Sequence, residues 1–206
     1  MLAADVLLVL LFQFLRSMAA PLRTFLALEI PQGVRDAAAR LMERLKTQHA
    51  KVRWTEPHNL HVTLKFLGDV DVTSVSAVCD AVSRATESIS PFRVAFSGAG
   101  AFPDVQRPRV LWLGVKEGVE PLVEMHAGIE KQLAELTYPY DGRRFAPHVT
   151  LGRVRGPGHG LTAQLEKDSE FPAGDMLVEE VVVFSSELTR EGPLYTPMGR
   201  AELSGK

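Results

Sequence analysis

The tetrapeptide His-Val-Thr-Leu stands at residues 61–64 and again at residues 148–151, and this repeat is the strongest indication of the fold. The alternation of polar and apolar residues in each copy is typical of a half-buried β-strand. Residues i and i+2 of a strand point to the same face, about 6.6 Å apart. Two such strands side by side would therefore line a pocket with two imidazoles and two hydroxyls. These groups suit acid–base catalysis on a phosphate ester.

The segments around the two motifs recur in a similar order, which indicates an internal duplication. We therefore expect an α+β fold with two pseudo-symmetric lobes of antiparallel sheet, outer helices and a central cleft that carries one His-x-Thr motif from each lobe. The predicted strands are 23–30, 52–54, 60–67, 92–96, 110–115, 148–154, 176–188 and 194–203, and the predicted helices are 33–49, 72–89, 119–136 and 161–167.

Composition restricts the class of protein. The chain has 206 residues with 46% apolar and 23% charged residues, as in ordinary globular domains. Its net charge of −2 argues against a protein that coats nucleic acid through a strongly basic surface. Its one cysteine excludes an internal disulfide and a zinc site built from several cysteines. We expect residues 21–206 to form one bilobal domain.

Residues 1–20 form an apolar extension with three interpretations. It is a segment that precedes a natural start at Met18, a packed helix, or an export signal. Asp5 and the lack of Lys or Arg before the apolar run 6–15 argue against a signal peptide. The run is also shorter than the ~20 residues that a spanning helix needs. We therefore expect a cytoplasmic protein with no membrane association.

Three stretches around the motifs carry a family resemblance. They are Arg-Thr-Phe-Leu-Ala-Leu-Glu-Ile-Pro (23–31), Val-Arg-Trp-Thr-Glu-Pro-His-Asn-Leu-His-Val-Thr-Leu-Lys-Phe-Leu-Gly (52–68) and Pro-His-Val-Thr-Leu-Gly-Arg-Val-Arg (147–155). They resemble the 2H phosphoesterases, and within them the RNA 2′,3′-cyclic phosphodiesterases, also called 2′-5′ RNA ligases. The resemblance runs from about residue 22 to residue 203.

This resemblance implies hydrolysis of an RNA 2′,3′-cyclic phosphate to a 2′-phosphomonoester, with no metal and no cofactor. It also implies a reversible 2′-5′ joining of RNA ends without ATP. By the same likeness His61 is the proton donor and His148 the proton acceptor. Thr63 and Thr150 match the phosphate-binding hydroxyls, and Arg153 matches a phosphate-binding arginine. The implied partner is an RNA end with a 2′,3′-cyclic phosphate, or a small cyclic nucleotide, bound by a monomer.

Arg153 can face the pocket only if the strand is locally irregular. Strict alternation would place it on the face opposite His148, and a bulge at Gly152 would turn it back toward the pocket. We expect Lys65 and Arg155 to be solvated charges at the rim.

Aromatic side chains near the motifs are candidates for stacking on a nucleobase. Trp54, Phe25 and Tyr195 are the candidates for base contact. Phe66 keeps the parity of the apolar motif residues, so we expect it in the core. The histidines outside the motifs lack a threonine two residues on, and we expect surface or supporting positions for them: His49, His58, His126 and His159.

Two rival functions remain open at this stage. One is a zinc or manganese hydrolase that uses both motif histidines and a carboxylate such as Asp141, although no helical metal-binding motif supports it. The other is a non-catalytic protein that binds the phosphate of RNA or a nucleotide. Arg and Lys bind phosphate better than His does, so two paired histidines favour the enzyme.

Overall fold

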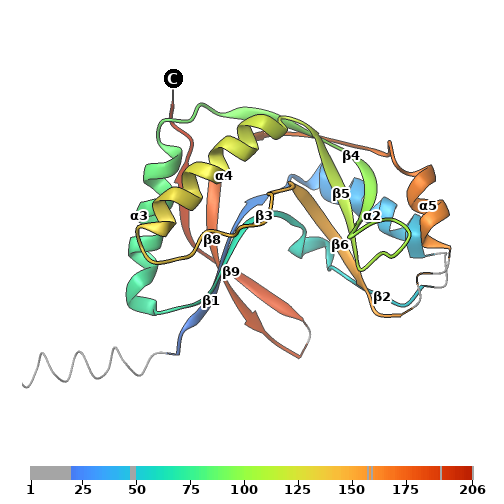
Figure 1. Ribbon diagram of the computed structural model, residues 1–206, viewed down its shortest axis with the longest axis horizontal. Coiled ribbons are helices and arrows are strands. Elements are labelled where there is room, and N and C mark those ends of the chain that lie inside the picture. Colours follow the sequence, from blue (N-terminus) through green and yellow to red (C-terminus); the bar gives the residue numbers. More distant parts are fainter. Residues whose placement is uncertain (1–19, 47–49, 157, 159, 191, 206) are drawn as a thin grey trace, which may run out of the picture.

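The computed structural model of the chain describes residues 20–46, 50–156, 158, 160–190 and 192–205 (Figure 1). The predicted extension 1–20 lies outside the described residues, apart from Ala20. Within the described ranges, no helix is both long enough and apolar enough to cross a membrane.

The described strands form one nine-stranded sheet whose neighbouring strands pair antiparallel. Its order is β7-β4-β5-β6-β3-β1-β8-β9, and β2 pairs with β6 outside this path. The strands are β1 (Leu22–Glu29), β2 (Val52–Trp54), β3 (His61–Val70), β4 (Phe92–Phe102), β5 (Val110–Glu117), β6 (His148–Val154), β7 (Pro172–Val178), β8 (Glu180–Leu188) and β9 (Pro193–Glu202).

The sheet divides into two lobes where β3 meets β6, because these two strands share a single residue pair, Val62 opposite Val149. Helices α3 (Val75–Thr86) and α4 (Val119–Ala134) lie together on one lobe, and α2 (Gln32–Lys46) and α5 (Leu161–Lys167) lie together on the other (Figure 1). Two short 3₁₀ turns, η1 (Pro57–Asn59) and η2 (Val72–Ser74), complete the elements. The predicted α+β fold with two lobes is confirmed.

The two halves of the chain exchange their helices. The units β1-α2-β3 and β5-α4-β6 are the repeated parts, and in each unit the two strands pair antiparallel. However, α2 packs against β7 and α5, in the lobe that holds β5 and β6. Conversely, α4 of the second half packs against α3 in the lobe that holds β1 and β3. There the carboxylate of its Glu130 forms an ion pair with Lys65 of β3. Each lobe is therefore built from both halves of the chain.

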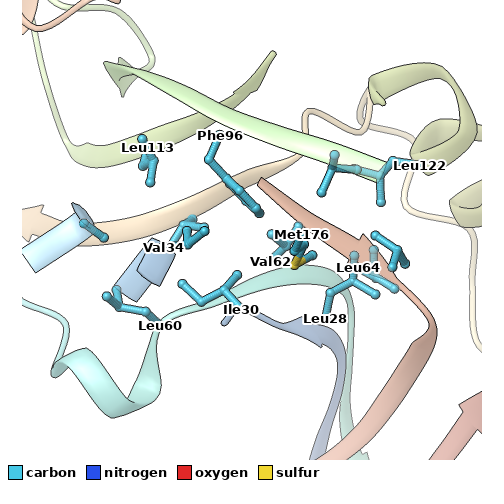
Figure 2. Close-up of a cluster of buried hydrophobic side chains, with 14 of the residues drawn as sticks. Leu28, Ile30, Val34, Leu60, Val62, Leu64, Phe96, Leu113, Leu122 and Met176 are labelled. Carbon is cyan, nitrogen blue, oxygen red and sulfur yellow. The ribbon is translucent and has the colours of Figure 1, made fainter. Parts of the chain in front are cut away.

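The core lies between the sheet and these helices (Figure 2). Val62 and Leu64 point into it from the first motif, and both are less than 5% exposed. The apolar face of α2 also lies in this core, since Val34, Leu41 and Leu45 are each about 1% exposed or less. Burial of each such side chain stabilises the fold by roughly 1.5–3 kcal/mol. The inward valines and leucines thereby hold the polar motif residues on the opposite face.

The C-terminal part differs from the prediction. The segment 176–188 was expected to be one strand, but Glu179 separates β7 from β8. The two strands pair in different lobes, β7 with β4 and β8 with β1, so the chain must cross between lobes at this point. The strand beginning at Phe92 also continues to Phe102, beyond its predicted end at residue 96, because it pairs with β5 as far as Phe102.

Candidate active site

The pairing of β3 with β6 builds the site. Val62 lies opposite Val149, and both side chains are fully buried. The His and Thr that flank each valine therefore point to the other face of the sheet. Because the strands are antiparallel, each histidine lies across from the threonine of the other copy: His61 from Thr150, and His148 from Thr63.

The two imidazoles are oriented in the same way. Nδ1 of His61 lies 2.8 Å from the carbonyl oxygen of Asn59, and Nδ1 of His148 lies 2.7 Å from that of Ala146. A carbonyl oxygen only accepts hydrogen bonds, so each Nδ1 carries a proton and donates it. Each Nε2 is then left to accept a proton when the ring is neutral, or to donate one when the ring is charged.

Both imidazoles favour the neutral form in the free protein. Burial lowers the pKa of His61, the hydrogen bond to Asn59 opposes this effect, and the nearby charge of His148 lowers the pKa further. Burial also lowers the pKa of His148, against the hydrogen bond to Ala146, and the charge of Arg153 adds to the lowering. A bound anion would reverse this balance, because a negative charge favours the imidazolium.

A cavity of about 370 Å³ opens beside the motifs. His148 is not among its lining residues. Its ring lies edge-on against Phe102, with 5.0 Å between centroids, and is close enough to affect the pKa of His61. The lining residues are Arg53, Trp54, Thr55, Glu56, Asn59, His61, Thr63, Phe66, Thr150, Arg153, Arg155, Gly192, Pro193 and Tyr195.

A β-bulge follows the motif in both strands. Leu64 is the extra residue in the pairing of β3 with β1, and Leu151 is the extra residue in the pairing of β6 with β5. Each bulge reverses the alternation, so the fifth residue after the histidine returns to the histidine's face. The prediction that Arg153 turns toward the pocket is supported in this way. The prediction that Phe66 lies in the core is wrong, because the same shift leaves it 68% exposed at the cavity.

The prediction that Lys65 lies at the rim is also wrong, because the same bulge turns its side chain into the core. Lys65 is 6% exposed, and its Nζ lies 2.8 Å from both carboxylate oxygens of Glu130 and from the carbonyl oxygen of Pro139. His126 is 6% exposed beside this pair rather than on the surface, and it stacks on Phe145 with 4.1 Å between ring centroids. This buried cluster joins β3 to the loop that leads into His148.

Aromatic rings support His61 from behind. Phe25 was a candidate for base contact, but it is 3% exposed and does not line the cavity. Its ring lies 5.0 Å from His61, 5.9 Å from Phe66 and 4.9 Å from Tyr195, measured between centroids. Phe25 thus fixes the wall of the site. The other two candidates, Trp54 and Tyr195, do line the cavity.

Sequence reasoning missed part of the cavity lining, including Phe66 and Asn59. The duplication itself held the signal for Phe66, since it stands five residues after His61 as Arg153 stands five after His148. No spacing marks Asn59. Its carbonyl accepts from His61, and its buried side-chain amide donates to the carbonyl of Pro193 at 2.9 Å, so it joins the histidine to the start of β9.

The described residues hold no group of three or more His, Cys, Asp or Glu side chains that could bind a metal ion. Asp141, the carboxylate considered for a metal hydrolase, does not line the cavity. Hydrogen bonds from Arg143 hold the pKa of Asp141 at about 2. Besides imidazole, hydroxyl and arginine side chains, the cavity lining includes one carboxylate, Glu56.

The family model described as LigT-like phosphoesterase matches this chain twice, at residues 28–112 and 113–195. Each match contains one His-Val-Thr-Leu motif, so the two matches divide the chain as the duplication does.

Individual relatives extend the comparison. The RNA 2′,3′-cyclic phosphodiesterase of Methanothermobacter thermautotrophicus is 36% identical over 178 residues, which cover 85% of this chain and 96% of that protein. The crystal structure of TT0787 of Thermus thermophilus matches with a TM-score of 0.74 and 26% identity over 89% of this chain and 99% of that one. E. coli LigT complexed with 3′-AMP matches with a TM-score of 0.71 and 25% identity over 90% and 99%.

Proposed function

Since the chain belongs to the LigT-like phosphoesterase family, we propose that it hydrolyses RNA 2′,3′-cyclic phosphate ends to 2′-phosphomonoesters by two-histidine acid–base catalysis. The carrying observation is the pairing of β3 with β6, which places two histidines and two threonines on one face. The similar proteins named RNA 2′,3′-cyclic phosphodiesterase and the 3′-AMP complex of E. coli LigT support the same substrate class.

The reaction follows from the geometry of the two rings. His148, neutral in the free protein, accepts a proton from water at Nε2 as the water oxygen bonds to phosphorus. The bond from phosphorus to the 3′ oxygen breaks, and His61 donates the proton of its Nε2 to that oxygen. The product keeps its phosphate on the 2′ oxygen. His148 ends protonated and His61 neutral, and exchange with solvent restores both.

The other polar groups bind the phosphate. Thr63 and Thr150 donate hydrogen bonds to its non-bridging oxygens, where negative charge grows in the transition state. Arg153 adds a fixed positive charge on the same face. The phosphate anion in turn favours the charged form of His61, which burial disfavours.

The same arrangement supports 2′-5′ joining of RNA ends. A 5′ hydroxyl replaces the water, His148 takes its proton, and the strain of the cyclic phosphate provides the driving force without ATP. We further propose that the protein acts as a monomer in the cytoplasm. Gel filtration coupled to light scattering tests the first point, and fractionation with N-terminal sequencing of the native protein tests the second.

The test uses a short RNA that ends in a 2′,3′-cyclic phosphate, incubated in EDTA with the wild type and with His61→Ala and His148→Ala. His58→Ala is the matched control, because His58 is an exposed histidine just before the first motif. We expect the wild type and the control to form a product that a 3′-specific phosphatase leaves intact. Loss of activity in EDTA would favour the metal hydrolase, and RNA binding without conversion would favour the non-catalytic binder.

A further inference from the structure

A second hollow lies directly beside the catalytic cavity. We call it the arginine groove, and it is lined by residues 106–110, residues 153–156, Gly158, Gly160 and Thr162. Its volume is about 940 Å³, against about 370 Å³ for the catalytic cavity. Arg153 and Arg155 line both hollows, so the two adjoin each other at the end of β6.

The groove carries positive charge that the protein itself leaves largely unpaired. Arg107, Arg109, Arg153 and Arg155 are exposed, and no carboxylate is among the residues that line the groove. Among the described residues, only Arg107 of these four has an ion pair, at 3.6 Å from Asp104.

The rest of the protein does not share this charge. The chain as a whole has a net charge of −2. A third hollow, beside β1 and β7, has a lining of opposite character, since Arg35 and Arg93 are outnumbered there by five carboxylates: Glu29, Asp175, Glu179, Glu180 and Glu202. The positive charge is therefore concentrated around the catalytic cavity and the arginine groove.

The chemistry of the substrate requires room outside the catalytic cavity. A volume of about 370 Å³ is near the lower end for a small-molecule pocket, which suits one terminal nucleotide. A 2′,3′-cyclic phosphate is always at the 3′ end, so the remaining strand extends only in the 5′ direction. Its next phosphates must leave the cavity, and the arginine groove is the positively charged hollow that adjoins it.

We propose that the arginine groove binds the phosphates on the 5′ side of the terminal nucleotide. The protein then acts on the ends of RNA strands in preference to free cyclic mononucleotides. This inference rests on the proposed function and deepens it, because it assigns to Arg107 and Arg109 a role that the reaction at the terminal phosphate does not need.

The experiment compares two substrates, a hexanucleotide with a 2′,3′-cyclic phosphate and a 2′,3′-cyclic mononucleotide. The variant Arg107→Gln/Arg109→Gln removes two charges from the groove and leaves the catalytic lining intact. The control Arg84→Gln/Arg93→Gln removes two charges elsewhere. We expect the groove variant to lose about tenfold or more in kcat/KM for the hexanucleotide and to keep wild-type kcat/KM for the mononucleotide. The salt dependence for the hexanucleotide should also fall, by about 0.7 in logarithmic slope for each lost phosphate contact.

Two outcomes would overturn the proposal while leaving the phosphodiesterase intact. One is an unchanged hexanucleotide reaction in the groove variant, and the other is an equal loss on both substrates. If the wild type converts neither substrate, the proposed function fails instead. The groove is then tested by fluorescence anisotropy with an RNA that ends in a 2′-phosphate. Weaker binding by the groove variant than by the control supports the proposal, and equal binding overturns it.

Discussion

The two motif strands begin alike and end differently. In both β3 and β6 a histidine and a threonine face the site, a valine and a leucine face the core, and a bulge follows. The bulge brings Phe66 to the site in one strand and Arg153 in the other. Duplication thus produced a symmetric pair of histidines on an asymmetric surface, with an aromatic ring beside one histidine and a positive charge beside the other.

The inward residue at the bulge differs as well. Lys65 enters the core of one lobe and pairs with Glu130 of α4. The corresponding residue of the other strand is Gly152, which β2 covers. A Cβ atom there would lie 2.8 Å from Cγ1 of Val52 and 3.0 Å from Cε3 of Trp54. One copy is therefore supported by a buried ion pair and the other by close backbone packing.

The largest expected effect on activity concerns the two histidines, which the motif strands have in common. His61→Ala and His148→Ala should each lower kcat by roughly 10²–10⁴-fold, because each removes one of the two proton transfers. The double variant should lose far less than the product of the two single losses, since both groups act in one step. Single-turnover rates on the cyclic-phosphate RNA provide the measurement. Multiplicative losses would show that the histidines act in separate steps.

The next largest effect concerns stability, through the residues that hold the two motif strands in place. Lys65→Met leaves the carboxylate of Glu130 buried without its lysine, and should lower the free energy of unfolding by about 3–5 kcal/mol. Lys65→Met/Glu130→Leu should recover most of this loss. Gly152→Ala should cost less, about 1–3 kcal/mol, through overpacking against β2. Urea unfolding measures all three, and a double variant no more stable than Lys65→Met would show that the ion pair is not the cause.

A smaller effect separates the two asymmetric side chains. Phe66→Ala removes a ring on which the terminal base can stack, and should raise KM by about tenfold with little change in kcat. Arg153→Gln removes a charge beside the phosphate and should instead lower kcat. Steady-state kinetics with purine and pyrimidine cyclic nucleotides distinguish the two. A fall in kcat alone for Phe66→Ala would assign the ring to the support of His61.

These contrasts show what could be read from the sequence. The alternation of His61, Val62 and Thr63 sufficed to predict the face of the catalytic groups, because buried valines leave a strand no other orientation. It failed at Phe66 and Lys65, because a bulge depends on pairing with a neighbouring strand. In β6 the glycine at 152 suggested the bulge, whereas Leu64 in β3 looks like any strand residue.

The exchange of helices between the halves was equally inaccessible from the sequence. The apolar faces of α2 and α4 predict burial but not the partner, so either lobe would satisfy them. The break at Glu179 has the same origin. A continuous apolar pattern predicts one strand, and only the pairing of β7 and β8 in different lobes divides it.

The smallest effect tests the roles of the two histidines through pH. Both pKa values lie below the usual 6.5, so kcat/KM should be bell-shaped with its maximum on the acidic side of that value. As the base, His148 must be neutral, so kcat/KM rises with pH through its pKa. Arg153→Gln removes a positive charge that lowers this pKa, so the pKa rises and the acidic limb should move to higher pH. Arg153→Lys keeps the charge and should leave the limb in place. A shift of the alkaline limb instead would exchange the roles and make His148 the acid.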